Sequence, residues 1–219
     1  MELNGKKIAF LGDSITEGYG PEKPENVYWR RIGALTGAQV LGYGVGGTRI
    51  ARQKVAIPNE PWTEETFAQR AETMPDDLDA IVVFGGTNDF GTGDAPLGNM
   101  DSRDVYSFYG ACHQLLEYLI TRYTGKPIVV MTPLHRLSES DDTYNELGLR
   151  RFGKLQVYVD ALREVAAYYG ITVVDLFREC PIQPKVEASR LMFMPDGLHP
   201  NDAGHELITR LLLNKLRSL

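Results

Sequence analysis

Residues 7–16 read KIAFLGDSIT, and this stretch decides the expected fold. Its first half, Lys7–Leu11, is a short apolar run of the kind found in strands that are buried on both faces. Gly12, Asp13 and Ser14 follow at once, which predicts a tight turn from the strand into a helix. Ligands of parallel α/β sheets bind at the carboxyl ends of the strands, so this turn is the first place to look for function.

Four further apolar runs repeat the pattern of the first. These runs are Gln39–Tyr43, Ala80–Gly85, Pro127–Thr132 and Ile171–Leu176. Segments of helical periodicity lie between them, at about Val27–Leu35, Glu64–Thr73, Arg103–Tyr123, Leu147–Tyr169 and Ala203–Leu216. Strands that alternate with helices form a parallel sheet with helices on both faces, because the crossovers are right-handed. No repeat or break in composition marks a boundary, so we expect one domain over residues 1–219.

The composition argues against several classes of protein. A net charge of −6 is unlike the basic surface of a nucleic-acid-binding protein. No apolar run approaches the roughly 18 residues that span a bilayer, so we expect no membrane insertion. The first residues show no signal-peptide pattern, which favours a cytoplasmic location, although a trimmed exported protein would look the same. Cys112 and Cys180 lie in no metal-binding motif; Cys112 is expected to be buried, and a disulfide between the two is a minor alternative.

Ser14 is a candidate nucleophile if a base removes its proton. His199 offers that base, and Asp196 precedes it by three residues in a loop that is rich in proline and glycine. The Asp196 carboxylate can then hold one ring nitrogen while the other faces Ser14. The simpler interpretation is that Asp196 caps the last helix and that His199 is a surface residue. Taken alone, the two interpretations weigh about equally.

Donors for an oxyanion follow three separate strands. They are the backbone N–H groups of Ser14 and Gly47 and the side-chain amide of Asn88. Each has a simpler interpretation, since Gly46-Gly47 suits a turn with positive φ and Asn88 suits an Asx-turn. Their joint placement after consecutive strands favours the catalytic interpretation.

These residues resemble the four sequence blocks of the SGNH hydrolases, also called the GDSL esterase/lipase family. The blocks read Gly12-Asp13-Ser14-Ile15, with Ile where the family name has Leu, then Gly47, Gly86-Thr87-Asn88-Asp89 and Asp196-Gly197-Leu198-His199-Pro200. They occur in the family's order and span residues 12–200. One departure is Gly42, which stands where many members have an asparagine.

The resemblance implies a three-layer α/β/α sandwich of flavodoxin-like type, with about five mainly parallel strands. It implies ester hydrolysis through an acyl-enzyme, with no metal and no cofactor. Ser14 would attack, His199 would shuttle the proton and Asp196 would orient His199. Ser14, Gly47 and Asn88 would form the oxyanion hole. Asp13 and Asp89 would hold their loops, because a carboxylate beside an oxyanion would repel it.

We expect a small-molecule ester as substrate, with a short acyl group such as acetyl on a carbohydrate or similar alcohol, since no long apolar insertion resembles a lipase lid. Apolar candidates for the pocket are Trp62, Phe90, Met192 and Met194. His135 follows the fourth strand and could also line the pocket, although an ordinary loop histidine is the simpler interpretation. His113 is expected to be structural or exposed, and His205 to lie at the surface.

Several alternatives stay open or are disfavoured. A thioesterase or lysophospholipase-type hydrolase would use the same residues, and a non-catalytic carbohydrate-binding module could share the fold. Residues 42–47 satisfy the dinucleotide-binding pattern G-x-G-x-x-G, but Pro58 and Pro61 interrupt the helix that should follow. An α/β-hydrolase is disfavoured because Ser14 lacks the G-x-S-x-G context of that fold. The sequence leaves the oligomeric state open.

Overall fold

The five predicted strands form one parallel sheet in a computed structural model, which describes residues 1–141, 143–149 and 151–219. The strands are β1 (Lys7–Gly12), β2 (Gln39–Gly44), β3 (Ala80–Phe84), β4 (Ile128–Met131) and β5 (Thr172–Val174). Their order is β2-β1-β3-β4-β5, and every neighbouring pair is parallel. This is the flavodoxin-like order, so the predicted fold class is confirmed.

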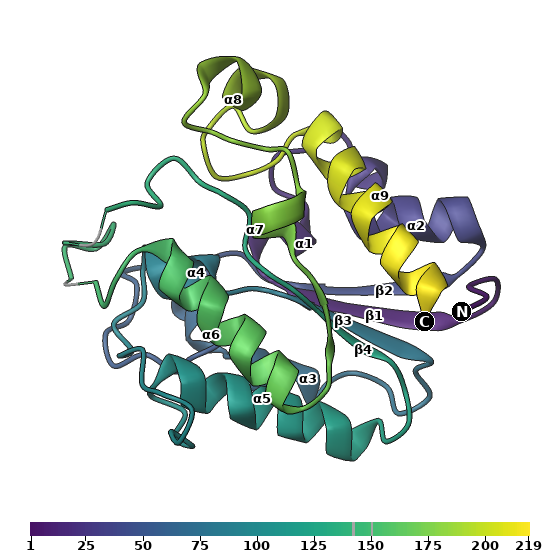
Figure 1. The fold of residues 1–219 in the computed structure, drawn as a ribbon, viewed down its shortest axis with the longest axis horizontal. Helices are drawn as coiled ribbons and strands as arrows, with labels where there is room; N and C mark the ends of the chain where they lie inside the picture. The colour runs from purple at the N-terminus through teal and green to yellow at the C-terminus, as the bar shows by residue number, and fades with distance from the viewer. Residues whose placement is uncertain (142, 150) are drawn as a thin grey trace.

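Helices cover both faces of the sheet (Figure 1). The α-helices are α1 (Ser14–Glu17), α2 (Tyr28–Thr36), α3 (Phe67–Ala71), α4 (Thr87–Gly91), α5 (Phe108–Arg122), α6 (Leu155–Tyr168), α7 (Leu176–Glu179), α8 (Glu187–Phe193) and α9 (Asp202–Ser218). Two 3₁₀ turns cover Pro24–Asn26 and Pro61–Glu64. Helices α2 and α9 pack together on one face, whereas α3, α5 and α6 pack on the other.

Alternating side chains of β1 supply a separate apolar core to each face. Ala9 and Leu11 join the core beneath α5 and α6, while Ile8 and Phe10 join the core beneath α2 and α9. This division follows from the period of two in a strand, which sends successive side chains to opposite faces. Strands β2 and β5 are different, because they lie at the two edges of the sheet and most of their residues are only partly buried or exposed. Burial on both faces is therefore a wrong expectation for β2 and β5.

Three of the expected helices begin later than their periodicity suggests. Helix α3 begins at Phe67 instead of Glu64, because Glu64 ends a 3₁₀ turn and Thr66 is the N-cap of the helix. Helix α6 begins at Leu155 instead of Leu147, because Gly148 and Gly153 take positive φ values of 72° and 144° in the preceding turns. Arg150 of that predicted range lies outside the described residues. Helix α5 begins at Phe108 instead of Arg103, after a turn in which the Asp104 carboxylate accepts hydrogen bonds.

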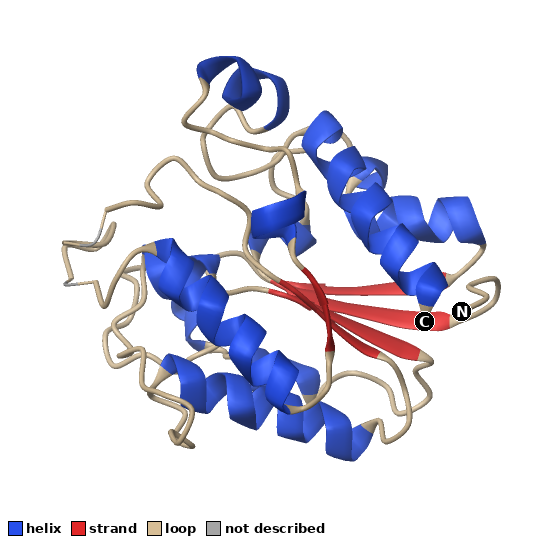
Figure 2. Cartoon of the chain, in the orientation of Figure 1, coloured by secondary structure: helices blue, strands red, loops and turns tan. Residues whose placement is uncertain are grey.

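The long connections gather beyond the carboxyl ends of the strands, at the left of Figure 2. The short helices α1 and α4 start there, directly after β1 and β3. None of the helices in the described residues is both long and apolar enough to cross a membrane. Cys112 and Cys180 are both buried and free, so they do not form a disulfide in this structure.

Candidate active site

Ser14, His199 and Asp196 form a continuous chain of hydrogen bonds at the carboxyl edge of the sheet. Ser14 Oγ lies 3.0 Å from Nε2 of His199, and Nδ1 of the same ring lies 2.7 Å from Asp196 Oδ2. A base whose second nitrogen is held by a carboxylate has a fixed tautomer and can accept a proton from the serine. The structure therefore brings together the three residues that the sequence singled out.

Hydrogen bonds within the loop that carries His199 fix its conformation. Asp196 Oδ1 accepts the backbone N–H groups of Leu198 and His199 at 2.8 and 2.7 Å, and Gly197 takes a φ of 80°. The N-terminal cap of α9 is Asn201, whose side chain accepts two backbone N–H groups of that helix. The simpler interpretation of Asp196 as the cap of the last helix is thus wrong.

Asp196 is held in its charged form. Partial burial raises the pKa of this carboxyl, but the hydrogen bonds from the two backbone N–H groups and from the His199 ring outweigh burial and leave the pKa below its ordinary value. A carboxylate that stays ionised at neutral pH can stabilise a positive charge on the neighbouring ring.

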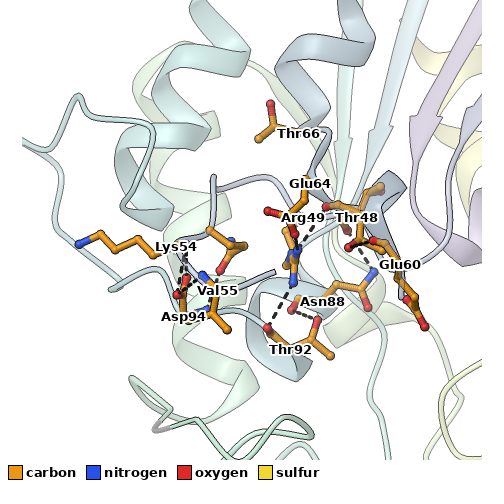
Figure 3. Close-up of polar contacts among 12 residues, drawn as sticks. Thr48, Arg49, Lys54, Val55, Glu60, Glu64, Thr66, Asn88, Thr92 and Asp94 are labelled. Carbon is orange, nitrogen blue, oxygen red and sulfur yellow. Dashed lines mark hydrogen bonds and ion pairs between the residues drawn. The ribbon is translucent and has the colours of Figure 1, made fainter. Parts of the chain in front are cut away.

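The residues of three candidate N–H donors, Ser14, Gly47 and Asn88, line one cleft. The Ser14 N–H lies at the start of α1, and within the described residues neither it nor the Gly47 N–H donates a hydrogen bond to protein. Asn88 Nδ2 donates to the Thr48 carbonyl oxygen at 3.1 Å, as Figure 3 shows. Since an amide carries two N–H bonds, this contact fixes the Asn88 side chain and leaves its second N–H for a ligand.

Gly47 occupies a position that a larger residue could not take. Its φ is 74°, in a turn closed by the Thr48 N–H and the Val45 carbonyl oxygen at 3.4 Å. A Cβ at Gly47 would lie 2.7 Å from Cγ2 of Thr63. Both the backbone conformation and the close approach of Thr63 therefore require glycine.

Arg70 is a residue of this site that the sequence interpretation missed. It is 4% exposed and donates to the carbonyl oxygens of Gly12 and Tyr43 at 2.7 and 2.5 Å and to Oγ1 of Thr48 at 2.9 Å. Burial lowers the pKa of Arg70 to about 10, so the guanidinium remains charged at neutral pH. One side chain thus joins the end of β1, which leads to Ser14, to the turn that carries Gly47.

A signal for Arg70 exists in the sequence. Phe67, Arg70 and Ala71 are three and four residues apart, and all three are buried on one face of α3. A charged residue on the apolar stripe of an amphipathic helix indicates a buried ionic or hydrogen-bonding role.

Asp13 and Asp89 hold loops, as expected. Asp89 accepts the backbone N–H groups of Ile50 and Ala51 at 3.0 and 2.9 Å, and Asp13 accepts that of Ile15 at 3.1 Å. Burial raises the pKa of each carboxyl to about 6, against the lowering effect of these hydrogen bonds.

A cleft of about 390 Å³ opens over these groups. It is lined by Ser14, Tyr19, Gly46, Gly47, Ile57, Glu60, Trp62, Asn88, Thr92, Glu146, Leu147, Leu198 and His199. A larger groove of about 650 Å³ lies between α2 and β2, but its lining holds no pair of a nucleophile and a base. The chemistry therefore points to the smaller cleft.

Of the predicted pocket residues, Trp62 lines the cleft, and the others do not. Phe90 and Met194 are each 0% exposed and pack in the two cores, so neither can contact a ligand. His135 is paired with Glu139 at 2.7 Å and stacks on Phe177.

Two further predictions are wrong in position. Met192 is exposed on α8 but does not line the cleft. His205 is buried instead of lying at the surface, and its Nδ1 accepts the Tyr28 N–H at 3.1 Å.

In the described ranges, no group of three or more His, Cys, Asp or Glu side chains is arranged to hold a metal ion.

The chain is similar to known proteins in both sequence and fold. The model of the GDSL-like lipase/acylhydrolase family matches residues 10–207. A solved structure of a protein from Lactobacillus plantarum is 31% identical, covers 99% of this chain and 98% of its own, and superimposes with a TM-score of 0.82. No curated protein matches the chain in sequence.

More distant structures share the fold. A lipase/acylhydrolase from Enterococcus faecalis is 23% identical, with a TM-score of 0.66 and coverage of 97% of this chain and 96% of its own. A member of the lipolytic G-D-S-L family from Veillonella parvula is 20% identical, with a TM-score of 0.63 and coverage of 98% and 100%.

Proposed function

The chain belongs to the GDSL-like lipase/acylhydrolase family, and from this premise we propose that it is a serine esterase whose acyl-enzyme forms on Ser14. The observation that carries the proposal is the unbroken contact from Ser14 Oγ through the His199 ring to Asp196. Serine becomes nucleophilic when a positioned base accepts its proton, and this pair supplies both the base and the group that orients it.

In the proposed first step, Ser14 Oγ attacks the carbonyl carbon of the ester while its proton moves to Nε2 of His199. The carbonyl oxygen becomes an oxyanion and accepts hydrogen bonds from the N–H groups of Ser14, Gly47 and Asn88. Donors that are already in place when charge develops stabilise the transition state, with about 3 kcal/mol for each donor.

In the second step, the bond from the carbonyl carbon to the alcohol oxygen breaks, and His199 returns its proton to that oxygen. The acyl group remains on Ser14. Water then attacks the carbonyl carbon of the acyl-enzyme while one of its protons moves to Nε2 of His199. The bond from that carbon to Ser14 Oγ breaks, His199 returns the proton to Ser14 Oγ, and the carboxylic acid leaves. Asp196 stabilises the imidazolium in both halves of the reaction, and its lowered pKa keeps it ionised for this role.

We propose that the substrates carry short acyl groups such as acetyl on a carbohydrate or similar small alcohol. The cleft volume of about 390 Å³ lies near the lower end of the range of about 300–1,000 Å³ found for small-molecule sites. Tyr19 and Trp62 line it and are 54% and 53% exposed, which offers flat apolar surfaces to the ring of an alcohol.

Labelling with a fluorophosphonate probe tests the nucleophile, and p-nitrophenyl esters of increasing acyl length test the substrate class. We expect the probe on Ser14 alone, no labelling of Ser14→Ala, and the highest kcat/KM for acetyl or propionyl esters. Labelling at another residue would refute the proposed nucleophile. A preference for long acyl chains would refute the short-acyl proposal while leaving the nucleophile intact.

A further inference from the structure

Glu60 lies on the cleft wall beside Gly47. Its Oε2 would be 3.4 Å from a Cβ placed on Gly47, and the residue lines the same cleft as Ser14 and Asn88. Figure 3 draws Glu60 and Asn88 together, with Glu60 on the side of Thr48 away from Lys54. The Glu60 side chain is therefore a neighbour of Gly47, one of the three proposed oxyanion donors, and shares its cleft with the other two.

The backbone of Glu60 is fixed, but its carboxylate is not engaged. Its N–H donates to the Ile57 carbonyl oxygen, and its own carbonyl oxygen accepts the N–H and Oγ1 of Thr63 at 3.0 and 2.7 Å. Within the described part of the chain, no hydrogen bond or ion pair reaches the Glu60 carboxylate. The acceptor is held at the wall of the cleft and remains free for a ligand.

No positively charged side chain of the cleft lining compensates the negative charge of Glu60. The lining contains two carboxylates, Glu60 and Glu146, and no lysine or arginine. Glu146 is paired with the buried guanidinium of Arg136. The buried Arg49 near Asn88 is paired with Glu64 at 3.1 Å (Figure 3).

An unpaired carboxylate beside an oxyanion opposes catalysis, because like charges repel more strongly in a cleft than in bulk water. The repulsion is reduced when the substrate itself donates a hydrogen bond to the carboxylate. An anionic substrate group would instead add to the repulsion. The position of Glu60 therefore discriminates between substrates by what they carry next to the ester.

We propose that Glu60 is a specificity-determining residue that accepts a hydrogen bond from a free hydroxyl beside the scissile ester. The preferred substrates are then partly acylated polyols, and esters with a nearby anionic group, such as lysophospholipids and acyl-coenzyme A thioesters, are disfavoured. This inference rests on the proposed esterase function and names the alcohol that the esterase selects.

Two substrate pairs test the inference. The first is a methyl glycoside monoacetate with a free neighbouring hydroxyl, compared with the same ester in which that hydroxyl is methylated. The wild-type protein should favour the free hydroxyl in kcat/KM by about tenfold or more, as expected for a hydrogen bond to a charged acceptor. Glu60→Ala should abolish this preference.

The second pair is p-nitrophenyl butyrate and the anionic p-nitrophenyl hemisuccinate. The wild-type protein should disfavour the anion by about tenfold, and Glu60→Gln should bring the ratio close to one. Glu65→Gln is the matched control, because Glu65 is an exposed carboxylate of the same segment outside the cleft lining. It should keep both wild-type ratios.

The outcomes separate the two proposals. Absence of hydrolysis of every ester, together with absence of probe labelling at Ser14, would refute the esterase. Normal hydrolysis with equal ratios in the wild-type, Glu60→Ala and Glu65→Gln proteins would refute the role of Glu60 alone. A preference for an ammonium over a hydroxyl neighbour would refute the polyol class.

Discussion

Asn88 and His199 line the same cleft. Asn88 lies in a buried hydrogen-bond network, whereas His199 lies in a short loop whose hydrogen bonds are mainly internal. Asn88 is 8% exposed and bonds to Thr48, which in turn is bonded to the buried Arg70. His199 is bonded to Asp196, which is only three residues away. The difference indicates that changes on the Asn88 side should reduce stability and activity together, while changes on the His199 side should reduce activity alone.

The sharpest test of this contrast is His199→Ala. The proposed base would be lost, so we expect kcat to fall by about 10⁴-fold or more. The free energy of unfolding should change by less than about 1 kcal/mol, because the ring is partly exposed and leaves few buried partners. Steady-state kinetics and urea denaturation measure the two quantities. A large loss of stability would contradict the contrast.

Asn88→Ala should affect both quantities. Loss of one oxyanion donor lowers kcat by about 10²–10³-fold. The buried Thr48 carbonyl oxygen also loses its donor, which should lower the free energy of unfolding by roughly 1–3 kcal/mol. Asn214→Ala, on the exposed side of α9, is the control and should change neither. Loss of activity at unchanged stability would show that Asn88 is not part of a supporting network.

Arg70→Lys should come next in size. Lysine keeps the charge but cannot reach Gly12, Tyr43 and Thr48 together in the geometry of a guanidinium. We expect kcat to fall by about 10–10²-fold through displacement of the two loops, with a smaller change in KM. Added guanidinium should restore part of the activity of Arg70→Ala, and the exposed Arg210→Lys serves as control. Absence of rescue, with kcat and KM equally affected, would argue for a merely structural role.

The last prediction concerns the pH dependence of stability, which should have opposite signs in the two regions. The pKa of Asp89 is raised to about 6, so the folded protein binds its proton more tightly than the unfolded chain. Stability from this group is present below pH 4 and is lost as the pH rises through about 6, by roughly 3 kcal/mol. Asp89→Asn should flatten that part of the profile.

The pKa of Asp196 is lowered, so its contribution is present above the unfolded pKa near 4 and is lost as the pH falls. Asp196→Asn should therefore abolish an increase in stability with rising pH, whereas Asp89→Asn should abolish a decrease. Urea denaturation from pH 4 to pH 8 measures both variants. Parallel profiles for the two variants would contradict the assigned directions.

The sequence predicts the sheet well because buried parallel strands are continuous apolar runs, and all five strands begin and end within a residue or two of the runs. The sequence does not predict the short helices. Helices α1 and α4 span four or five residues, too few to show a period, and tertiary contacts stabilise them. Helix α6 begins later than its pattern indicates, because apolar residues of the preceding loop continue the helical pattern by chance.

The candidate site is predictable where strand order alone brings residues together. Ser14, Gly47 and Asn88 follow neighbouring strands of the sheet, so topology places them at one edge. Pocket walls are different, because whether Phe90 faces the cleft or the core depends on side-chain packing against Tyr158. No sequence pattern marks Glu60 as a pocket residue. It lies in a loop between Pro58 and Pro61, and hydrogen bonds with Thr63 and Ile57 set the path of this loop.

The hydrogen bonds within residues 196–199 have a dynamic consequence. Base and carboxylate sit on one rigid turn, so motion of this loop moves them as one body and changes the distance from Ser14 Oγ to the ring without changing the distance from the ring to Asp196. In the proposed mechanism, a displaced loop would be an inactive state in which the imidazole keeps its tautomer. Return to the proposed active state would then need only a translation of the loop, with no proton exchange.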